Sequence, residues 1–200
     1  MNCKKGYILL LGLTILTSVT GCKKNNTVSS ISEQDIQLAQ TVDDSSQLTV
    51  NDTENNQQII FTTEGIYRTL DNQSLEKYNK QYKSFKTIKY FYNDDKDTSI
   101  AVAKVAPLNK SKKDYFSDLE KNVKTIFPQA KYTQGVTNDN QHSYARYSYH
   151  DPKNGLNNAC DVILMEMTKT LYSICAISPS QSIEFLKEAV KNVSVRALKQ

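Results

Sequence analysis

Apolar side chains recur at helical intervals in the middle of the chain and again near its end. Between positions 112 and 127 the intervals are four, four and three residues, which places these side chains along one stripe of a helix. The stripe consists of Tyr115, Leu119, Val123 and Ile126. Ser111 and Asp114 resemble a capping box at its start, and Pro128 prevents continuation. The pattern therefore predicts an amphipathic helix over 112–127.

Two further segments have helical spacing. After Pro179 and Ser180, intervals of three, four and three separate the apolar residues Ile183, Leu186, Val190 and Val193. An earlier helix is predicted to begin at Asp71 or Asn72, either of which can cap it. Its apolar face would carry Leu75, Tyr78 and Tyr82. Each helix has one apolar side and is expected to pack on a sheet.

The segments between these helices are rich in β-branched and aromatic residues and are divided by polar turns, a pattern typical of antiparallel hairpins. The three predicted hairpins pair 85–92 with 100–105, 131–136 with 143–150, and 159–167 with 171–177. Short strands are expected at 59–61 and 66–70. The segment 151–158, which contains Pro152 and Gly155, is predicted to be a longer loop.

Hairpins separated by single helices predict one α+β domain over 59–200, in which a largely antiparallel sheet has helices packed on it. The order of elements resembles the PsbP and DcrB-like α-β-α sandwiches. The resemblance rests on the helix from Tyr115 to Ile126, the strand containing Leu171-Tyr172-Ser173-Ile174, and the closing helix from Ile183 to Val193. It implies an exported, often lipid-anchored domain and transfers no catalytic residues.

The N-terminal residues 1–21 have the three parts of an export signal, which are Lys4 and Lys5, an apolar run from Tyr7 to Leu16, and small residues before a cleavage point. That run is about half of the roughly 20 residues needed to span a bilayer, which indicates a removable signal. The segment Val19-Thr20-Gly21-Cys22 then resembles the bacterial lipobox. The resemblance implies cleavage before Cys22 and a diacylglyceryl group on its thiol. An ordinary secretory signal is the alternative.

The segment 22–58 is predicted to be a lipid anchor followed by a flexible tether. It is rich in Asn, Ser, Thr, Gln and Asp, and its isolated Ile and Val residues follow no sustained period. Such a segment buries too little apolar surface to offset the entropy lost on ordering. We therefore expect the folded domain to lie just off the membrane surface.

Composition and charge narrow the function classes. The chain has 200 residues with 38% hydrophobic and 23% charged residues, values ordinary for a globular protein. Its net charge of +4 includes Lys4 and Lys5 of the signal, which leaves +2 for the remainder. This balance gives no electrostatic argument for nucleic-acid binding.

Two cysteines remain in the predicted domain, Cys160 and Cys175. A hairpin turn at Met167 and Thr168 places them directly opposite each other, and a turn one residue later places them diagonally on the same face. They form either a disulfide, which direct opposition favours, or a pair of buried free thiols. The absence of a Cys-x-x-Cys spacing argues against a thiol oxidoreductase.

The histidines and the tyrosines are the remaining candidates for metal binding or ligand stacking. His142 and His150 lie at opposite ends of one predicted strand, roughly 26 Å apart at about 3.3 Å per residue, so they are not expected to share a metal ion. The 12 tyrosines form either half-buried sheet packing or a surface that stacks sugars or peptides. The latter would include Tyr90, Tyr92, Tyr144, Tyr147 and Tyr149. No cofactor-binding motif is found.

The sequence thus predicts a lipoprotein anchored to the outer side of a bacterial cell membrane, or to the outer membrane of a Gram-negative cell. Its domain is expected to be a non-catalytic binding or accessory module whose partner is an envelope protein or a wall component. One alternative is an envelope hydrolase that acts on wall or peptide material through Asp94, Asp95 or Asp97. The other is a solute-binding lipoprotein of an import system, which would need two lobes.

Overall fold

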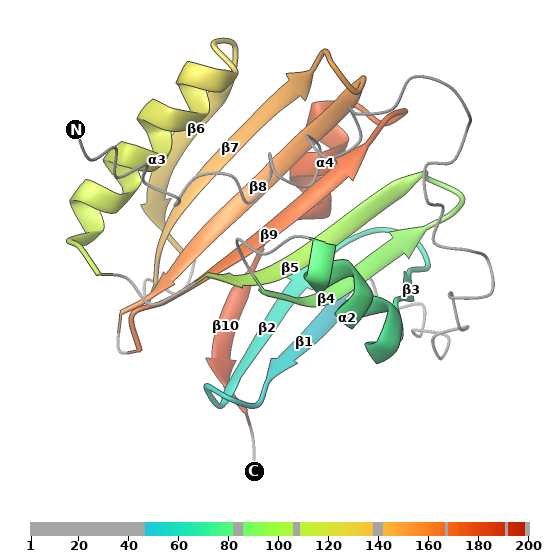
Figure 1. Ribbon diagram of the computed structural model, residues 1–200, viewed down its shortest axis with the longest axis horizontal. Coiled ribbons are helices and arrows are strands. Elements are labelled where there is room, and N and C mark those ends of the chain that lie inside the picture. The colour runs from blue at the N-terminus through green and yellow to red at the C-terminus, as the bar shows by residue number, and fades with distance from the viewer. Residues whose placement is uncertain are drawn as a thin grey trace.

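The computed structural model describes residues 47–81, 86–105, 109–137, 142–166, 168–190 and 192–198 (Figure 1). The predicted export signal and the Val19 to Cys22 motif lie outside the described residues. The described chain contains helices and two antiparallel sheets, so the predicted α+β class is confirmed. No helix among these residues has the length and apolar character needed to cross a membrane.

The larger sheet has seven strands in the order β3-β4-β5-β9-β8-β7-β6, and every neighbouring pair is antiparallel. In chain order its strands are β3 (Arg68–Thr69), β4 (Lys86–Asn93), β5 (Thr98–Val105), β6 (Lys131–Val136), β7 (Ser143–Asp151), β8 (Leu156–Met165) and β9 (Thr170–Ser178). The three predicted hairpins are β4–β5, β6–β7 and β8–β9. Each pairs as expected.

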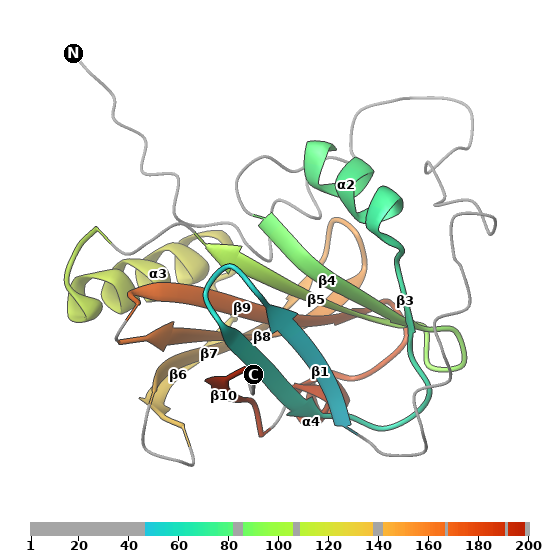
Figure 2. The same ribbon diagram turned by 90° about the horizontal axis from the view of Figure 1, so that it is seen from below.

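The smaller sheet joins the two ends of the described chain. Its strands are β1 (Gln47–Asp52), β2 (Gln57–Thr62) and β10 (Ser194–Ala197), in the order β1-β2-β10. Figure 2 shows β1 and β2 lying over one face of the larger sheet. Side chains from both sheets meet in one apolar core, which includes Val50, Phe61 and Val195 from the small sheet.

The described part of the chain contains three helices, which are α2 (Asn72–Gln81), α3 (Lys112–Ile126) and α4 (Ile183–Ala189). Helix α3 covers the opposite face of the large sheet, where Tyr115, Phe116, Leu119 and Val123 form a second apolar core. Helix α4 packs against β7, β8 and β9 on the same face as the small sheet, and its Leu186 is part of the core that both sheets share. Helix α2 lies beside β4, where the Asn79 side chain bonds to both backbone groups of Thr87.

The helix starts follow the capping residues in the sequence. Ser111 accepts a hydrogen bond from the Asp114 amide at the start of α3, and Asp71 accepts one from the Ser74 amide at the start of α2. Ser182 caps α4, where it accepts a hydrogen bond from the Phe185 amide. Phe116, which lay outside the predicted stripe, is buried, whereas Ile126 is exposed because α3 ends there.

The predicted tether over 22–58 is wrong in its last part. Residues from Gln47 onward are ordered, and β1 alternates exposed and buried positions, with Leu48, Val50 and Asp52 buried. Residues 47–58 therefore belong to the folded domain, which does not begin at residue 59. The period-two pattern is present in the sequence, but it extends over only two apolar positions within a polar segment.

Two other predictions are corrected near the C-terminal half. The segment 151–158 is not a long loop, because β7 extends through Asp151 and β8 begins at Leu156. Asp151 accepts hydrogen bonds from the Lys153 amide and the Asn154 side chain, and Gly155 has a φ of 67°, so the turn between the strands is tight. The last helix ends at Ala189 and is followed by β10, which was not predicted.

Candidate functional site

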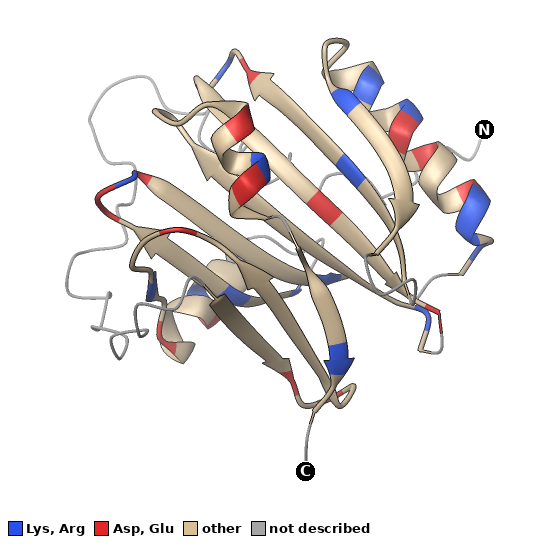
Figure 3. Ribbon diagram, turned by 180° about the vertical axis from the view of Figure 1, so that it is seen from behind, with Lys and Arg blue, Asp and Glu red and all other residues tan. Residues whose placement is uncertain are grey.

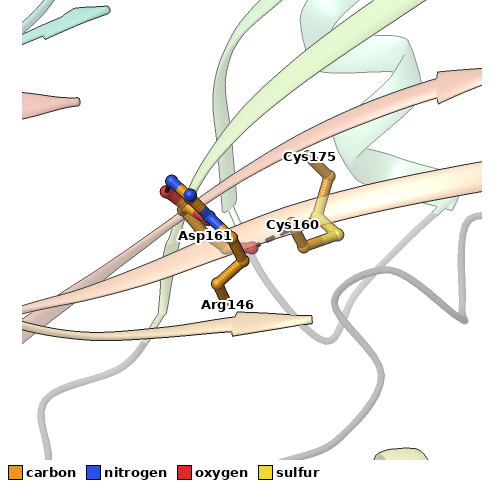
Figure 4. Close-up of a disulfide and its surroundings, with 5 residues drawn as sticks. Arg146, Cys160, Asp161 and Cys175 are labelled. Carbon is orange, nitrogen blue, oxygen red and sulfur yellow. Dashed lines mark hydrogen bonds and ion pairs between the residues drawn. A yellow bond between two sulfur atoms is a disulfide. The ribbon is translucent and has the colours of Figure 1, made fainter. Parts of the chain in front are cut away.

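Cys160 and Cys175 are joined by a disulfide. They are directly opposed across β8 and β9, the first of the two predicted registers, with their Cα atoms 4.1 Å apart. Both side chains are buried in the core beneath α3. Figure 4 shows the disulfide on one side of β8 and the neighbouring Asp161 on the other. The cysteines therefore cross-link two central strands and present no free thiol.

The acidic residues proposed for hydrolysis lie on the turn between β4 and β5. Asp94, Asp95 and Asp97 are exposed. Asp94 forms an ion pair with Arg68 at 3.0 Å, and none of the three carboxylates lines a cavity described below. The arrangement is that of a solvated turn.

The structure separates the two histidines. His142 contacts the Val195 carbonyl oxygen through Nε2, at 3.2 Å, and so links β7 to β10. His150 pairs with Asn157 across β7 and β8. Among the described residues no three His, Cys, Asp or Glu side chains are grouped to hold a metal ion.

The tyrosines of β7 alternate between the two faces of the sheet. Tyr147 and Tyr149 are buried on the α3 side, whereas Tyr144 is half-buried on the opposite side. Tyr90 and Tyr92 on β4 are partly buried, and the Tyr90 ring packs against Tyr78 of α2. Sheet packing therefore accounts for these tyrosines, and they form no continuous exposed aromatic surface.

A charged cluster fastens the small sheet to the large one. Asp52, at the end of β1, accepts a hydrogen bond from the Tyr172 hydroxyl at 2.7 Å and faces Lys104 at 3.4 Å. Burial alone would raise the pKa of Asp52, but the hydrogen bonds from Tyr172 and Asn55 and the charge of Lys104 bring it below its ordinary value. Since all these groups are paired, the cluster is structural.

An apolar groove of about 350 Å³ lies where α3 ends beside the turn between β7 and β8. Pro128 follows the helix, and the backbone turns back through a hydrogen bond from the Ala130 amide to the Phe127 carbonyl. The tight turn after Asp151 brings Pro152 to the other side of the groove. Because these are two unrelated chain segments, sequence periodicity gave no signal for the groove.

The floor of this groove is a pair of aromatic rings. Phe127 stacks on Tyr149 with ring centroids 3.9 Å apart and planes inclined by 17°. Ile126 lies on the groove with 42% of its surface exposed. The remaining exposed lining residues Gln129, His150 and Lys153 are polar. An apolar centre within polar surroundings is the usual anatomy of a protein-binding pocket.

The Tyr149 hydroxyl is a buried polar group without a hydrogen-bond partner among the described residues. Burial, followed by the nearby Tyr147 and Asp151, raises the pKa of Tyr149 well above its ordinary value. The hydroxyl thus keeps its proton and is a donor at physiological pH. Buried hydrogen-bond donors are nearly always paired. An unpaired donor beside a groove is therefore a candidate contact for a bound group.

The sequence identified Phe127 as a helix end, Pro128 as a helix stop, and Tyr149 as either a sheet-packing residue or part of a stacking surface, and it did not bring the three together. Their proximity depends on α3 crossing the sheet so that its last turn lies over β7, which neither segment encodes alone. No known family model matches this chain, and no curated protein sequence matches it significantly.

Proposed function

We propose that this protein is a membrane-anchored cell-envelope lipoprotein whose folded domain is a non-catalytic binding module. The N-terminal pattern supports the anchor, because the apolar run is followed by the lipobox-like Val19-Thr20-Gly21-Cys22. In this proposal the signal is cleaved before Cys22, which carries the lipid. The domain then faces the extracytoplasmic side of the membrane.

The proposal includes a fold of the PsbP and DcrB-like type. In its favour are a hairpin, the amphipathic helix α3, further hairpins and the closing helix α4 in that order. The small sheet β1-β2-β10 is a feature that this resemblance does not explain, since it covers a sheet face together with α4.

The apolar groove carries the proposed binding function, and the decisive observation is the exposed Ile126 beside the stacked rings of Phe127 and Tyr149, whose buried hydroxyl lacks a partner among the described residues. We propose that it takes an aromatic side chain from an extended segment of an envelope protein. The side chain would pack against Phe127 and Pro152. A main-chain carbonyl beside it would accept a hydrogen bond from the Tyr149 hydroxyl after a shift of the lining side chains that now bury this group. A volume of about 350 Å³ suits one such side chain with its flanking peptide groups.

No observation favours the hydrolase or the solute-binding alternative to the same degree. The Asp94, Asp95 and Asp97 carboxylates lie on an exposed turn outside the cavities. The described elements pack around one large sheet, without the two lobes that a solute-binding lipoprotein needs.

The groove is tested with N-acetyl-tryptophanamide, an indole flanked by two peptide groups. The protein contains no tryptophan, so the indole emission can be excited without a protein signal. We expect saturable binding with a blue shift, weakened by Tyr149→Phe through loss of one hydrogen bond, by about fivefold to tenfold. Tyr144→Phe, the same change on the opposite face of β7, is the matched control. Equal binding by all three proteins would contradict the assignment.

The anchor is tested separately by intact mass spectrometry of the protein from its own membranes. A mass that begins at Cys22 and includes acyl chains is expected. In Cys22→Ala the protein should be released into the medium or remain as uncleaved precursor. A fully processed variant that stays in the membrane would refute the anchor and leave the groove proposal intact.

A further inference from the structure

A second cavity, of about 210 Å³, lies on the face of the large sheet opposite α3. It is formed between β7 and β8 on one side and the connection from α4 to β10 on the other, with Thr137 at its edge. Figure 3 shows that charged residues lie mainly on helices, turns and strand ends. Two charged side chains on central strands nevertheless line this cavity, Arg146 of β7 and Asp161 of β8.

Arg146 and Asp161 form a bidentate ion pair (Figure 4). The Nε and Nη2 atoms of Arg146 each lie 2.6 Å from a different oxygen of Asp161. The Asp161 side chain is 4% exposed and that of Arg146 is 30% exposed. The other three N–H groups of Arg146 have no hydrogen-bond partner within the described chain, and they remain available to a ligand.

The aromatic wall of the cavity is held in place by the edge strand. The Arg146 guanidinium lies 5.7 Å from the centre of the Tyr144 ring. Across the β6–β7 ladder, the ring rests on Gly135, where a Cβ atom would lie only 2.9 Å from the Tyr144 hydroxyl oxygen. Glycine is thus required for this ring position. Tyr144, the Arg146–Asp161 pair and Asn192, which lies in the connection from α4 to β10, all line this cavity.

Stability does not explain this pair. The free energy needed to remove two charges from water usually exceeds the attraction that a buried ion pair gains. Apolar residues of similar size in the same place often make a protein more stable. Burial raises the pKa of Asp161, although its hydrogen bonds and charge interaction with Arg146 act in the opposite direction. The Arg146–Asp161 pair is thus unfavourable to bury, yet it remains partly open to the cavity. This combination indicates a role in binding a ligand.

The charged groups that line the cavity determine which net charge a ligand can carry. Because Asp161 neutralises Arg146 at close range, the cavity offers little net attraction to either an anion or a cation. It does offer several donors on Arg146 and acceptor sites on Asp161, and it is also lined by Asn192 and by Thr137, whose hydroxyl accepts a hydrogen bond from the His142 amide. A volume of about 210 Å³ lies below the roughly 300–1,000 Å³ of pockets for drug-sized ligands, so the ligand of this cavity is small.

We propose that this cavity binds a neutral, hydroxyl-rich ligand of the size of one sugar ring. Vicinal hydroxyl groups both donate and accept, so they can bond to the carboxylate and the guanidinium at once. The ring would lie against Tyr144, whose apolar body complements the C–H groups of a sugar. This site is independent of the apolar groove, which lies on the other face of the sheet.

The test uses three sugars that share one ring but differ in charge, namely glucose, glucuronate and glucosamine. Binding to the full chain, purified in a detergent without a sugar headgroup, is followed by saturation-transfer NMR. We expect glucose to bind and the two charged sugars to bind about tenfold more weakly or not at all. Stronger binding of glucuronate than of glucose would overturn the proposal, because it would reveal an anion site on Arg146.

The double variant Arg146→Met with Asp161→Leu removes both charges together, so no unpaired buried charge remains. It should unfold at or above the parental temperature and lose glucose binding. The exposed pair Arg68 and Asp94 provides the matched control, with the same two substitutions, and should retain binding. Asn192→Gly keeps the positive φ of 58° and should weaken binding by about tenfold even if the double variant fails to fold. No glucose binding by the parent, or equal binding by all variants, would refute the site.

Discussion

The two faces of the large sheet are covered by different elements, and the side chains buried under each face differ in kind. Beneath α3 the core is apolar and aromatic and contains the Cys160–Cys175 disulfide. Beneath the small sheet and α4 the core is also apolar, but charged groups border it at Asp52 with Lys104 and at Arg146 with Asp161. The backbone of helix α3 is satisfied largely within the helix, and the Tyr132 hydroxyl and the Lys112–Glu166 ion pair add polar contacts to its packing on the sheet.

A sheet that covers another sheet faces a different requirement. The small sheet has three strands, and two of them are edges with unpaired backbone groups. Its position therefore depends on contacts beyond apolar packing, which the Asp52–Tyr172 hydrogen bond and the His142–Val195 contact supply. The comparison predicts that the face covered by the small sheet is the less stable of the two.

The largest effect is expected from Phe61→Ala in β2. Phe61 is fully buried and packs edge-on against Phe91 of β4, with ring centroids 5.9 Å apart, so it joins the two sheets. Its truncation should reduce the free energy of unfolding by about 4 kcal/mol, measured by urea denaturation. Hydrogen exchange should rise first in β1, β2 and β10. Phe61→Leu is the milder control, and uniform exchange across both faces would refute the comparison.

Removal of the disulfide tests the other face. Because the bridge closes a loop of 15 residues, Cys160→Ala with Cys175→Ala should lower the free energy of unfolding by about 3 kcal/mol. Reduction of the parent protein should produce the same loss in urea denaturation, and reductant should not affect the double variant. An unchanged stability would show that packing under α3 suffices without the cross-link.

Tyr172→Phe removes the hydroxyl that bonds to Asp52 and should cost about 2 kcal/mol at neutral pH. The folded pKa of Asp52 lies below the ordinary value of 3.8. The stability contributed by its ionised form is therefore fully present above that value and is lost as the pH falls through the lower, folded value. The difference between parent and variant should shrink in the same range of acid pH.

The matched control for this prediction is Tyr115→Phe on the α3 face. Burial raises the pKa of Tyr115 to about 12, and its hydroxyl has no hydrogen-bond partner among the described residues. This change should not destabilise the protein and should show no acid dependence. A Tyr172→Phe effect that persists unchanged at low pH would contradict the role of Asp52.

The smallest effect is expected from Tyr149→Phe. Since the Tyr149 hydroxyl is buried without a partner, its removal should raise the free energy of unfolding by about 1 kcal/mol. The same change should weaken binding of the indole probe in the groove. Stabilisation with unchanged binding would make this hydroxyl a structural defect and remove it from the proposed site.

Local patterns in the sequence predicted the α3 face well. The stripe Tyr115, Leu119 and Val123 predicted the helix. The turn between β8 and β9 limited Cys160 and Cys175 to two registers on one face, of which direct opposition is the one observed. In both cases the relevant residues lie within about 15 positions of each other, so periodicity and turn chemistry suffice.

The opposite face could not be predicted in the same way. Strand β10 has only four residues and pairs with β2, far away in the chain, which leaves no local signature. The Arg146–Asp161 pair was missed because 151–158 was interpreted as a loop, whereas Asp151 tightens the turn and sets the register of β7 and β8. The groove likewise depends on the crossing of two separate segments.

The position of β1 has a mechanical consequence for an anchored protein. If Cys22 holds the chain to a membrane, tension from the anchor reaches the described strands first at Gln47, the first residue of the edge strand β1. The β1–β2 ladder then bears the load before any strand of the cross-linked large sheet. Peeling off its six residues would extend the reach by about 20 Å, at roughly 3.3 Å per residue, while the groove and the disulfide stay intact. The small sheet would thus unfold first under tension from the membrane and protect the binding surfaces from the load.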